Sequence, residues 1–121
     1  MSIVTNVLAI LVAGLFLFIM YLETVITSSE KTSQVFNIPV EELAKPNLNV
    51  LMRNQGIYNG LVGVGLLYGV FLAQNPHEVV GMCLVYAISV AVYGAITSDK
   101  MILLKQGGLP ILALLSLWLL G

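Results

Sequence analysis

Charged side chains are scarce in this sequence, and their scarcity excludes several classes of protein. Only 9% of the 121 residues are charged, and five Lys and Arg stand against six Asp and Glu, for a net charge of −1. Nucleic-acid-binding modules carry an excess of basic residues, so we expect no nucleic-acid partner. Cys83 is the one cysteine and His77 the one histidine. These counts exclude a disulfide framework, and we expect neither a metal site nor a cofactor.

Apolar residues are abundant instead. Hydrophobic residues make up 59% of the chain, and the mean hydropathy is +0.98, which is typical of a protein that lies in a membrane. About 20 helical residues cross a hydrocarbon core about 30 Å thick, so the chain has room for four or five crossings and for no separate soluble domain. Because lipid forces the backbone to satisfy its own hydrogen bonds, we predict an all-α integral membrane protein of the cell membrane, with membrane lipids as partners.

Four windows of the chain carry no charge, and they locate the predicted spans. The windows 1–22, 54–77 and 79–98 are long enough to cross alone, and 106–121 becomes long enough if Lys105 reaches the headgroups from inside the helix. The first window has no basic residue ahead of its apolar run, the run is too long for a signal peptide, and no small-residue cleavage pattern ends it, so we expect a span there rather than a cleaved signal peptide. The prediction is one membrane domain, 1–121, built as a bundle of four antiparallel transmembrane helices at about 3–27, 54–73, 78–98 and 101–120, with a polar connection at 28–53.

The distribution of Lys and Arg predicts the orientation. The connection 28–53 contains Lys31, Lys45 and Arg53, and the turn between the third and fourth helices contains Lys100 and Lys105, whereas the 74–77 turn and both termini contain none. Four crossings place both basic connections on one face, which the positive-inside rule assigns to the cytoplasm. We therefore expect a multi-pass protein of the inner or plasma membrane with both termini outside the cytoplasm.

Two prolines, Pro39 and Pro46, bracket a short amphipathic stretch, 40–45, in the polar connection. This stretch is predicted to form a helix that lies on the lipid headgroups. Pro46, followed by Asn47 and Asn49, is expected to end it, because proline interrupts a helix and asparagine favours turns.

Small residues in the second predicted helix indicate close helix packing. Gly56, Gly60 and Gly63 follow one another at helical spacing, and Gly65 and Gly69 repeat the four-residue step. Helices in lipid associate where small residues let their backbones approach each other. Two alternatives stay open: packing inside the chain, and the seam of a homodimer.

The third predicted helix carries a stripe of hydroxyl groups on Tyr86, Ser89, Tyr93 and Thr97. At a spacing of i, i+3, i+7 and i+11, the four residues share one face of a helix. Hydroxyl groups in lipid need partners, so this face is expected to look inward.

Antiparallel helices bring the polar residues of all four spans to one depth. Glu23 lies near the end of the first span and several amides near the start of the second, while Tyr93 and Gln106 lie in the same half of the third and fourth. Residues distant in sequence then meet in one layer, as a pocket open to the cytoplasmic side requires. The candidate ligand-binding residues are Glu23, Asn54, Gln55, Tyr58, Asn59, Tyr93 and Gln106, and no catalytic residue is identified.

Glu23 and Pro110 each allow two interpretations. Glu23 is either a desolvated carboxylate about one turn inside the apolar run, with Lys105 or an amide as its partner, or an ordinary headgroup residue of a helix that sits higher. Pro110 either breaks a turn inside the fourth helix and frees the carbonyl of Gln106 for a polar cavity, or lies in the first turn of a shorter helix that begins at Leu109.

Four short segments carry a family resemblance. They are Met-Tyr-Leu-Glu at 20–23, Asn-Gln-Gly-Ile-Tyr-Asn-Gly at 54–60, Val-Tyr-Gly-Ala at 92–95 and Gln-Gly-Gly-Leu-Pro at 106–110. Over nearly its whole length the chain resembles the bacterial and fungal membrane proteins of domain-of-unknown-function family 1304. The resemblance implies a four-helix integral membrane protein and no particular activity. The family's signature residues fall on Glu23, Asn54, Gln55, Tyr58, Asn59, Tyr93, Gln106 and Pro110.

Three kinds of function are compatible with these residues. The first, which the sequence favours, is binding of a small amphipathic or lipid-like ligand in the cytoplasmic-side pocket, whose residues are uncharged apart from Glu23. The second is a dimeric small-molecule or proton-coupled transporter, by analogy with small multidrug exporters. The third is a membrane enzyme acting on a lipid-like substrate, with Glu23 as acid or base and Tyr93 or Tyr58 as hydrogen-bond donor. Whether the protein is an enzyme stays open.

Overall fold

The computed structural model describes residues 1–98, 100–101 and 103–121, and all regular structure in these ranges is helical. The all-α class is therefore confirmed. The chain divides into two compact units: unit 1 consists of Met1–Leu15 and Val62–Gly121, and unit 2 of Phe16–Leu61. Asp99 and Ile102, which the sequence places just before and at the start of the fourth predicted helix, lie outside the described residues.

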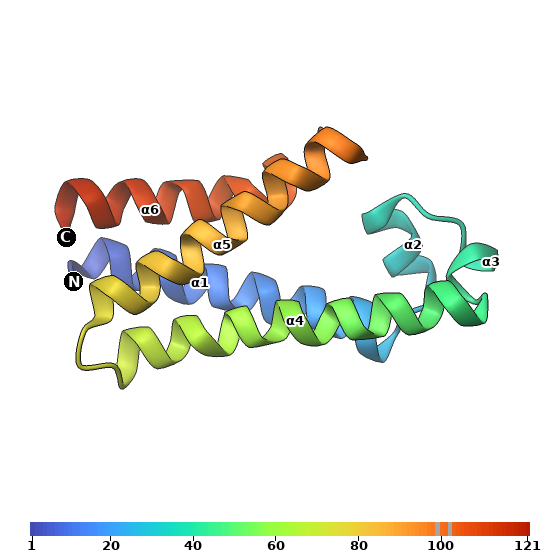
Figure 1. The fold of residues 1–121 in the computed structure, drawn as a ribbon, viewed down its shortest axis with the longest axis horizontal. Helices are drawn as coiled ribbons and strands as arrows, with labels where there is room; N and C mark the ends of the chain where they lie inside the picture. Colours follow the sequence, from blue (N-terminus) through green and yellow to red (C-terminus); the bar gives the residue numbers. More distant parts are fainter. Residues whose placement is uncertain (99, 102) are drawn as a thin grey trace. The chain divides into compact units, whose positions relative to one another are not determined.

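Three helical runs in the described chain are long and apolar enough to cross a membrane: Ile3–Val25, Pro76–Thr97 and Leu103–Leu120. The first consists of α1 (Ile3–Met20) and a π-helical segment, η1 (Tyr21–Val25). The second is α5 (Pro76–Thr97). The third joins a π-helical segment, η2 (Leu103–Gly107), to α6 (Gly108–Leu120). Figure 1 labels α1, α5 and α6.

The helix α4 (Pro46–Phe71) has 26 residues and is not one of the three apolar runs. Its first half contains Arg53 and several amides, which lower its hydropathy. It begins at Pro46 and not at residue 54, so Pro46 starts this helix instead of ending the preceding one. Proline suits the first position of a helix because the N–H it lacks would have no partner there. The N–H of Asn49 already bonds to the carbonyl of Lys45, at 2.9 Å.

Two short helices connect η1 to α4 in unit 2: α2 (Glu30–Phe36) and α3 (Val40–Leu43). Ser29 caps α2, because its Oγ accepts a hydrogen bond of 3.2 Å from the N–H of Thr32. Asn37 ends α2 at φ 56°, in the left-handed region that asparagine tolerates. The predicted surface helix at 40–45 thus contains α3, whereas α2 was not predicted.

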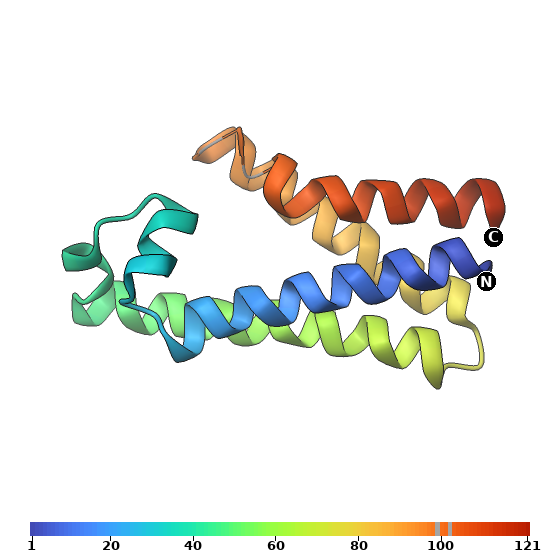
Figure 2. The same cartoon turned by 180° about the vertical axis from the view of Figure 1, so that it is seen from behind.

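In unit 1, α5 packs against η2 and α6, and Figures 1 and 2 both show α5 beside α6. The hydroxyl oxygens of Thr5 and Ser116, both buried, lie 2.6 Å apart and join α1 to α6. The N–H of Ser2 donates to the carbonyl of Gly121 at 2.5 Å, in keeping with the neighbouring N and C marks in Figure 2. The buried face of α5 consists of Val80, Leu84, Ala87 and Ala91.

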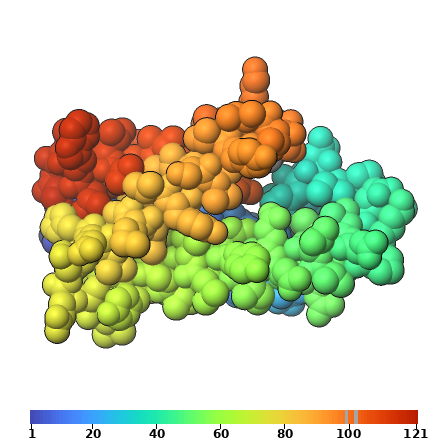
Figure 3. Space-filling view, in the orientation of Figure 1, coloured from blue at the N-terminus to red at the C-terminus, as the bar shows by residue number. Residues whose placement is uncertain are grey.

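The hydroxyl stripe of α5 lies opposite this buried face. Each of three stripe residues stands two positions after a buried residue of α5, and two positions correspond to about 200° around the helix. These residues are Tyr86, Ser89 and Tyr93. All three are exposed, and so is Thr97. The prediction of an inward-looking face was therefore wrong for unit 1. The hydroxyls of Ser89 and Thr97 donate instead to carbonyls four residues earlier, at 2.7 and 2.9 Å, so they need no partner on another helix. Figure 3 shows the surface of α5 in yellow to orange.

Pro110 is fully buried and lies in the first turn of α6. The helix continues on the N-terminal side of the proline, but as the wider π-helical turn η2. The structure thus combines the two interpretations of Pro110: the helical run is longer than one that begins at Leu109, and its α-helical part starts just before the proline.

The glycines of α4 contact other parts of the chain. A Cβ atom on Gly56 would overlap the hydroxyl of Thr24, and one on Gly60 would overlap the sulfur of Met20, both in unit 2. In unit 1, a Cβ on Gly65 would lie 3.1 Å from the sulfur of Cys83, and one on Gly69 would lie 2.8 Å from a methyl of Val80. Of the two alternatives for these glycines, packing inside the chain is confirmed for these four.

Candidate functional site

Glu23 is a charged residue with an exposed fraction of 0%, and it lies in the middle of η1. Two amides on α4 donate to its carboxylate: Gln55 Nε2 to Oε2 at 2.9 Å, and Asn59 Nδ2 to Oε1 at 2.6 Å. Gln55 and Asn59 are four residues apart and therefore share one face of α4. We call these three residues the carboxylate clamp, because they fasten η1 to α4 through both carboxylate oxygens.

Gly56 gives the clamp the room it needs. A Cβ atom at this position would lie 3.0 Å from Cβ of Glu23, in addition to its overlap with Thr24. A larger residue at position 56 would therefore push η1 away from α4 and carry Glu23 out of reach of the amides. The run Asn-Gln-Gly at 54–56 thus combines a donor to the carboxylate with the space for its approach.

Threonine hydroxyls hold the widened backbone of η1. A π-helical turn bonds each N–H to the carbonyl five residues back, as the N–H of Ile26 does to Tyr21, at 3.1 Å. Thr32, which is fully buried, donates to the carbonyl of Leu22 at 2.8 Å and to that of Ile26 at 3.0 Å. Thr27 donates to the carbonyl of Glu23 at 2.7 Å. Side chains therefore satisfy carbonyls of this turn, which buries Leu22 and Glu23 side by side.

No ion pair to Glu23 is present in the described part of the chain, where its recorded partners are the two amides. The ion pair between Lys45 and Glu42, at 2.9 Å, is on the surface of unit 2. A carboxylate buried at the end of an apolar helix without a counter-ion is costly to keep charged. Of the interpretations of Glu23, a desolvated carboxylate with an amide partner is the one that fits, because a headgroup residue would be exposed.

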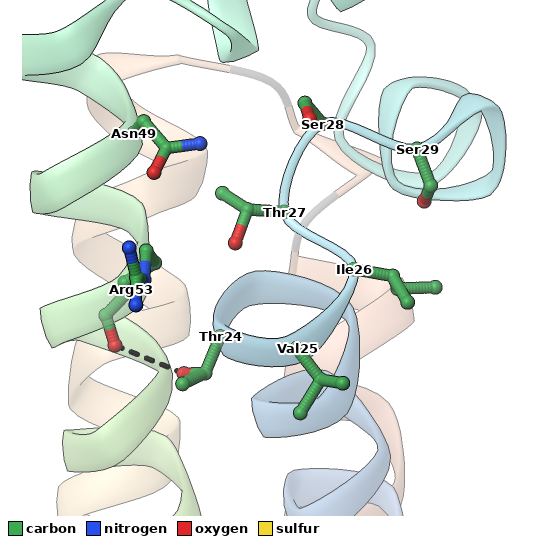
Figure 4. Close-up of a pocket in the computed structure, with 8 residues that line it drawn as sticks. All are labelled: Thr24, Val25, Ile26, Thr27, Ser28, Ser29, Asn49 and Arg53. Carbon is green, nitrogen blue, oxygen red and sulfur yellow. Dashed lines mark hydrogen bonds between the residues drawn. The ribbon is translucent and has the colours of Figure 1, made fainter.

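A polar cavity of about 470 Å³ opens beside the clamp, entirely within unit 2. The segment 24–29 forms one wall and α4 the other, as Figure 4 shows. Asn49 and Arg53 stand one turn apart on α4, and the hydroxyl of Thr24 donates to the carbonyl of Arg53 at 2.9 Å, which joins the two walls. The lining residues are Thr24, Val25, Ile26, Thr27, Ser28, Ser29, Asn49 and Arg53.

A second cavity, of about 300 Å³, shares Thr24 and Arg53 with the first and is also lined by Val50, Asn54 and Ile57. Arg53 therefore borders both cavities. Its side chain is exposed, and no ion pair to it is recorded within the described ranges. The region thus combines a neutral, hydroxyl-rich wall with one cation.

The structure brings together three of the seven predicted site residues, the clamp formed by Glu23, Gln55 and Asn59. Asn54 borders the second cavity, and Tyr58 is 64% exposed on α4. Tyr93 and Gln106 belong to unit 1, where Tyr93 is 69% exposed on α5 and Gln106 is half-buried in η2.

Sequence reasoning missed Arg53 as a site residue, together with the lining residues Asn49 and 24–29. Arg53 was used only as a charge that sets orientation. One signal was available: hydroxyl residues gather directly after the first apolar window, at Thr24, Thr27, Ser28 and Ser29. Asn49 and Arg53 are four residues apart, a spacing that places two residues on one face of a helix. The predicted second helix begins at residue 54, after both of them, so the spacing gave no signal.

Comparison with known proteins gives a family but no activity. A family model described as "Protein of unknown function (DUF1304)" matches residues 10–118, a range that includes the clamp and both cavities. The chain is 53% identical to the uncharacterized protein YpaA of Lactococcus lactis subsp. lactis (strain IL1403), over 116 residues that cover 96% of this chain and 98% of that protein. No solved structure matches the chain.

Proposed function

We propose that this chain, which belongs to the DUF1304 family, is a four-helix membrane protein that binds the polar head of a small amphipathic molecule. The observation that carries the proposal is the cavity of about 470 Å³ in unit 2, which begins where the apolar run Ile3–Val25 ends. A head group would lie among the hydroxyl groups of the cavity, while an apolar tail would stay in the membrane. The carboxylate clamp supports this role because it fixes one wall of the cavity against the other.

In this proposal α4 is the fourth span of an antiparallel bundle. Its large exposed apolar residues recur at helical spacing, which fits a face in contact with lipid. The 18 residues from 54 to 71 carry no charge, close to the roughly 20 that a crossing needs. The exposed stripe consists of Leu61, Val64, Tyr68 and Phe71, and it continues to Ile57, which also borders the second cavity.

The distribution of basic residues supports a cavity on the cytoplasmic side of the cell membrane. Unit 2 contains Lys31, Lys45 and Arg53, and Lys100 and Lys105 stand in the other basic connection. The positive-inside rule then places both connections in the cytoplasm and both termini outside.

Labelling of introduced cysteines tests binding and orientation together. Ser28 lines the cavity and is exposed, so Ser28→Cys in a Cys83→Ala background should react with a maleimide. Ser98→Cys is the matched control, since Ser98 is exposed after the end of α5 and lines neither cavity. We expect a total lipid extract, added to the delipidated protein, to slow labelling at position 28 and to leave position 98 unchanged.

The same variants report the sidedness in whole cells. A membrane-impermeant maleimide should label both positions only after the membrane is opened. Labelling of intact cells would contradict the orientation, and lipid-independent labelling at position 28 would contradict the binding role.

One observation favours a second candidate, proton-coupled transport of a small molecule. The Glu23 carboxylate is buried near a membrane face with amides and no cation as its recorded partners within the described chain. Such a carboxylate can alternate between a bound proton and a bound cation. Proteoliposomes with an imposed pH gradient would test this: uptake of a cationic dye that Glu23→Gln abolishes would favour transport over simple binding.

A further inference from the structure

We infer that the head group recognised in the cavity of unit 2 is a phosphate ester, and that Arg53 is the residue that recognises it. This inference rests on the proposed function, because it specifies the ligand of the same cavity. Its basis is the placement of Arg53, a cation with no ion pair within the described part of the chain, among hydroxyl groups at the end of a membrane-length helix.

Arg53 is positioned to receive an anion. It borders both cavities, and it is the one charged residue among the described residues that line either of them. The hydrogen bond from Thr24 to its carbonyl fixes its turn of α4 against the segment 24–29. A guanidinium group presents paired N–H donors that fit two oxygens of a phosphate, which a lysine ammonium cannot match.

The opposite wall adds a hydroxyl that is not in use. The hydroxyls of Thr24, Thr27 and Ser29 each donate to another group of unit 2. Ser28 is exposed and lines the cavity, and no hydrogen bond of its hydroxyl is recorded within the described chain. Ser28 can therefore donate to a phosphate oxygen that Arg53 holds from the other side.

The level of the cavity in the bilayer favours phosphate over other anions as its ligand. The run Ile3–Val25 has 23 residues, about 35 Å at 1.5 Å per residue, against a hydrocarbon core of about 30 Å. Thr24 and Val25, which line the cavity, therefore lie at one boundary of the core. Lipid phosphates are concentrated at this level, and a free phosphate ester would reach it from the aqueous side.

No acidic residue is among the described residues that line either cavity. Glu23 is fully buried, and both of its oxygens accept hydrogen bonds from the clamp amides. Glu42 is paired with Lys45. Glu30 is exposed at the start of α2 and does not line the cavity.

The test compares molecules that differ in one group. The full-length protein, delipidated in a neutral detergent, is titrated with dioctanoyl phosphatidic acid, with dioctanoylglycerol, which has the same chains and no phosphate, and with inorganic phosphate alone. We expect phosphatidic acid to bind at least about tenfold more tightly than dioctanoylglycerol, which corresponds to about 1.4 kcal/mol. Binding of inorganic phosphate with the same dependence on Arg53 would support phosphate recognition and identify a soluble ester as the source.

Four variants separate recognition from general attraction to a basic surface. Arg53→Gln removes the charge, Arg53→Lys keeps the charge without the paired donors, and Ser28→Ala removes one exposed hydroxyl with little risk to folding. Lys31→Gln is the matched control, because Lys31 is an exposed cation of unit 2, above the ring of Phe18, that lines neither cavity. We expect about a tenfold loss of phosphatidic acid affinity for Arg53→Gln, a smaller loss for Arg53→Lys and Ser28→Ala, and less than a twofold change for Lys31→Gln.

The outcomes distinguish this inference from the proposed function. Equal binding of phosphatidic acid and dioctanoylglycerol would overturn phosphate recognition and leave ligand binding intact. Equal losses of phosphatidic acid affinity in Arg53→Gln and Lys31→Gln would overturn the role of Arg53. If Arg53→Gln fails to fold, unchanged affinity in both Arg53→Lys and Ser28→Ala would overturn it instead. If neither phosphatidic acid nor dioctanoylglycerol binds, the proposed function fails and the inference with it.

Discussion

The π-helical segments η1 and η2 have the same length and geometry, but different residues account for the widened turn in each. Each comprises five residues at one end of a membrane-length helical run. In η1, hydroxyls of Thr27 and Thr32 take up backbone carbonyls, and the turn buries a carboxylate. In η2, Leu104 and Lys105 are exposed, and Pro110, which has no N–H to donate, follows shortly after.

A widened turn can therefore arise from a missing donor or from side chains that compete for its acceptors. In η1, competing side chains bring hydroxyls, amides and a carboxylate to one place. In η2, where the proline lacks a donor, the wide turn makes a packing contact instead: a Cβ on the buried Gly107 would lie 3.1 Å from Cβ of Ala91. The polar site is thus a property of the side chains around η1, and the irregular backbone alone does not predict one.

Gly56→Leu is expected to have the largest effect on the η1 side of this comparison. The new side chain would collide with Thr24 and Glu23 and separate η1 from α4, which should lower the free energy of unfolding by about 3 kcal/mol or more. The measurement is the apparent Tm and the monodisperse fraction in detergent. Gly14→Leu is the control, because Gly14 is exposed and a Cβ there meets nothing within 4 Å. Equal behaviour of the two variants would contradict the close approach at Gly56.

Glu23→Ala is expected to cost about 2–4 kcal/mol, because it leaves the amides of Gln55 and Asn59 without their acceptor. Glu23→Gln should cost clearly less, since a glutamine keeps the shape and can still accept and donate hydrogen bonds. Thermal unfolding of both variants beside Glu30→Ala, at an exposed position, measures the difference. If Glu23→Gln were as destabilising as Glu23→Ala, the charge and not the hydrogen bonding would hold the clamp together.

Thr32→Val should lower the stability by about 1–2 kcal/mol, because the carbonyls of Leu22 and Ile26 lose a donor while the volume is conserved. The informative readout is local. Hydrogen exchange should become faster at residues 21–27 and stay unchanged at 103–107. Equal acceleration in both segments would mean that the two π-helical turns are not held by different means.

Pro110→Ala is expected to have the smallest effect, within about 1 kcal/mol. The variant restores an N–H donor, which offsets the packing lost when the buried ring is removed. Exchange of the amides in η2 should slow as this turn moves toward α-helical geometry, with no change in η1. Unaltered exchange in η2 would show that the proline is not the cause of the wide turn.

Local patterns predicted much of this structure. Long charge-free windows identified the three apolar runs, because desolvation of the backbone dictates a helix in any such stretch. The convergence of Glu23, Gln55 and Asn59 followed from antiparallel helices and a four-residue step. The spacing of the α4 glycines predicted close packing but left two alternatives, packing inside the chain and a homodimer seam. The choice depends on which element lies opposite each glycine, and the spacing does not contain that information.

Other features depended on context that the sequence pattern does not contain. Pro46 can end one helix or begin the next, and the absence of a free N–H is compatible with both. The outward face of the α5 hydroxyl stripe was missed because Ser89 and Thr97 satisfy themselves on their own backbone. Arg53 was overlooked because its significance depends on the cavity that the segment 24–29 forms beside it.

The distribution of contacts around α4 has a consequence for mutational tolerance. At 3.6 residues per turn, Gly56 and Gly60 lie on one side of the helix and Gly65 and Gly69 on nearly the opposite side, while the clamp amides occupy a third. On the remaining side, Leu61, Val64, Tyr68 and Phe71 are exposed, and no glycine contact or clamp hydrogen bond is found there within the described chain. In a saturation scan of α4, substitutions should therefore be accepted in a narrow band that recurs once per turn, and there mainly by exchange of one apolar residue for another. The positions in that band are 61, 64, 68 and 71.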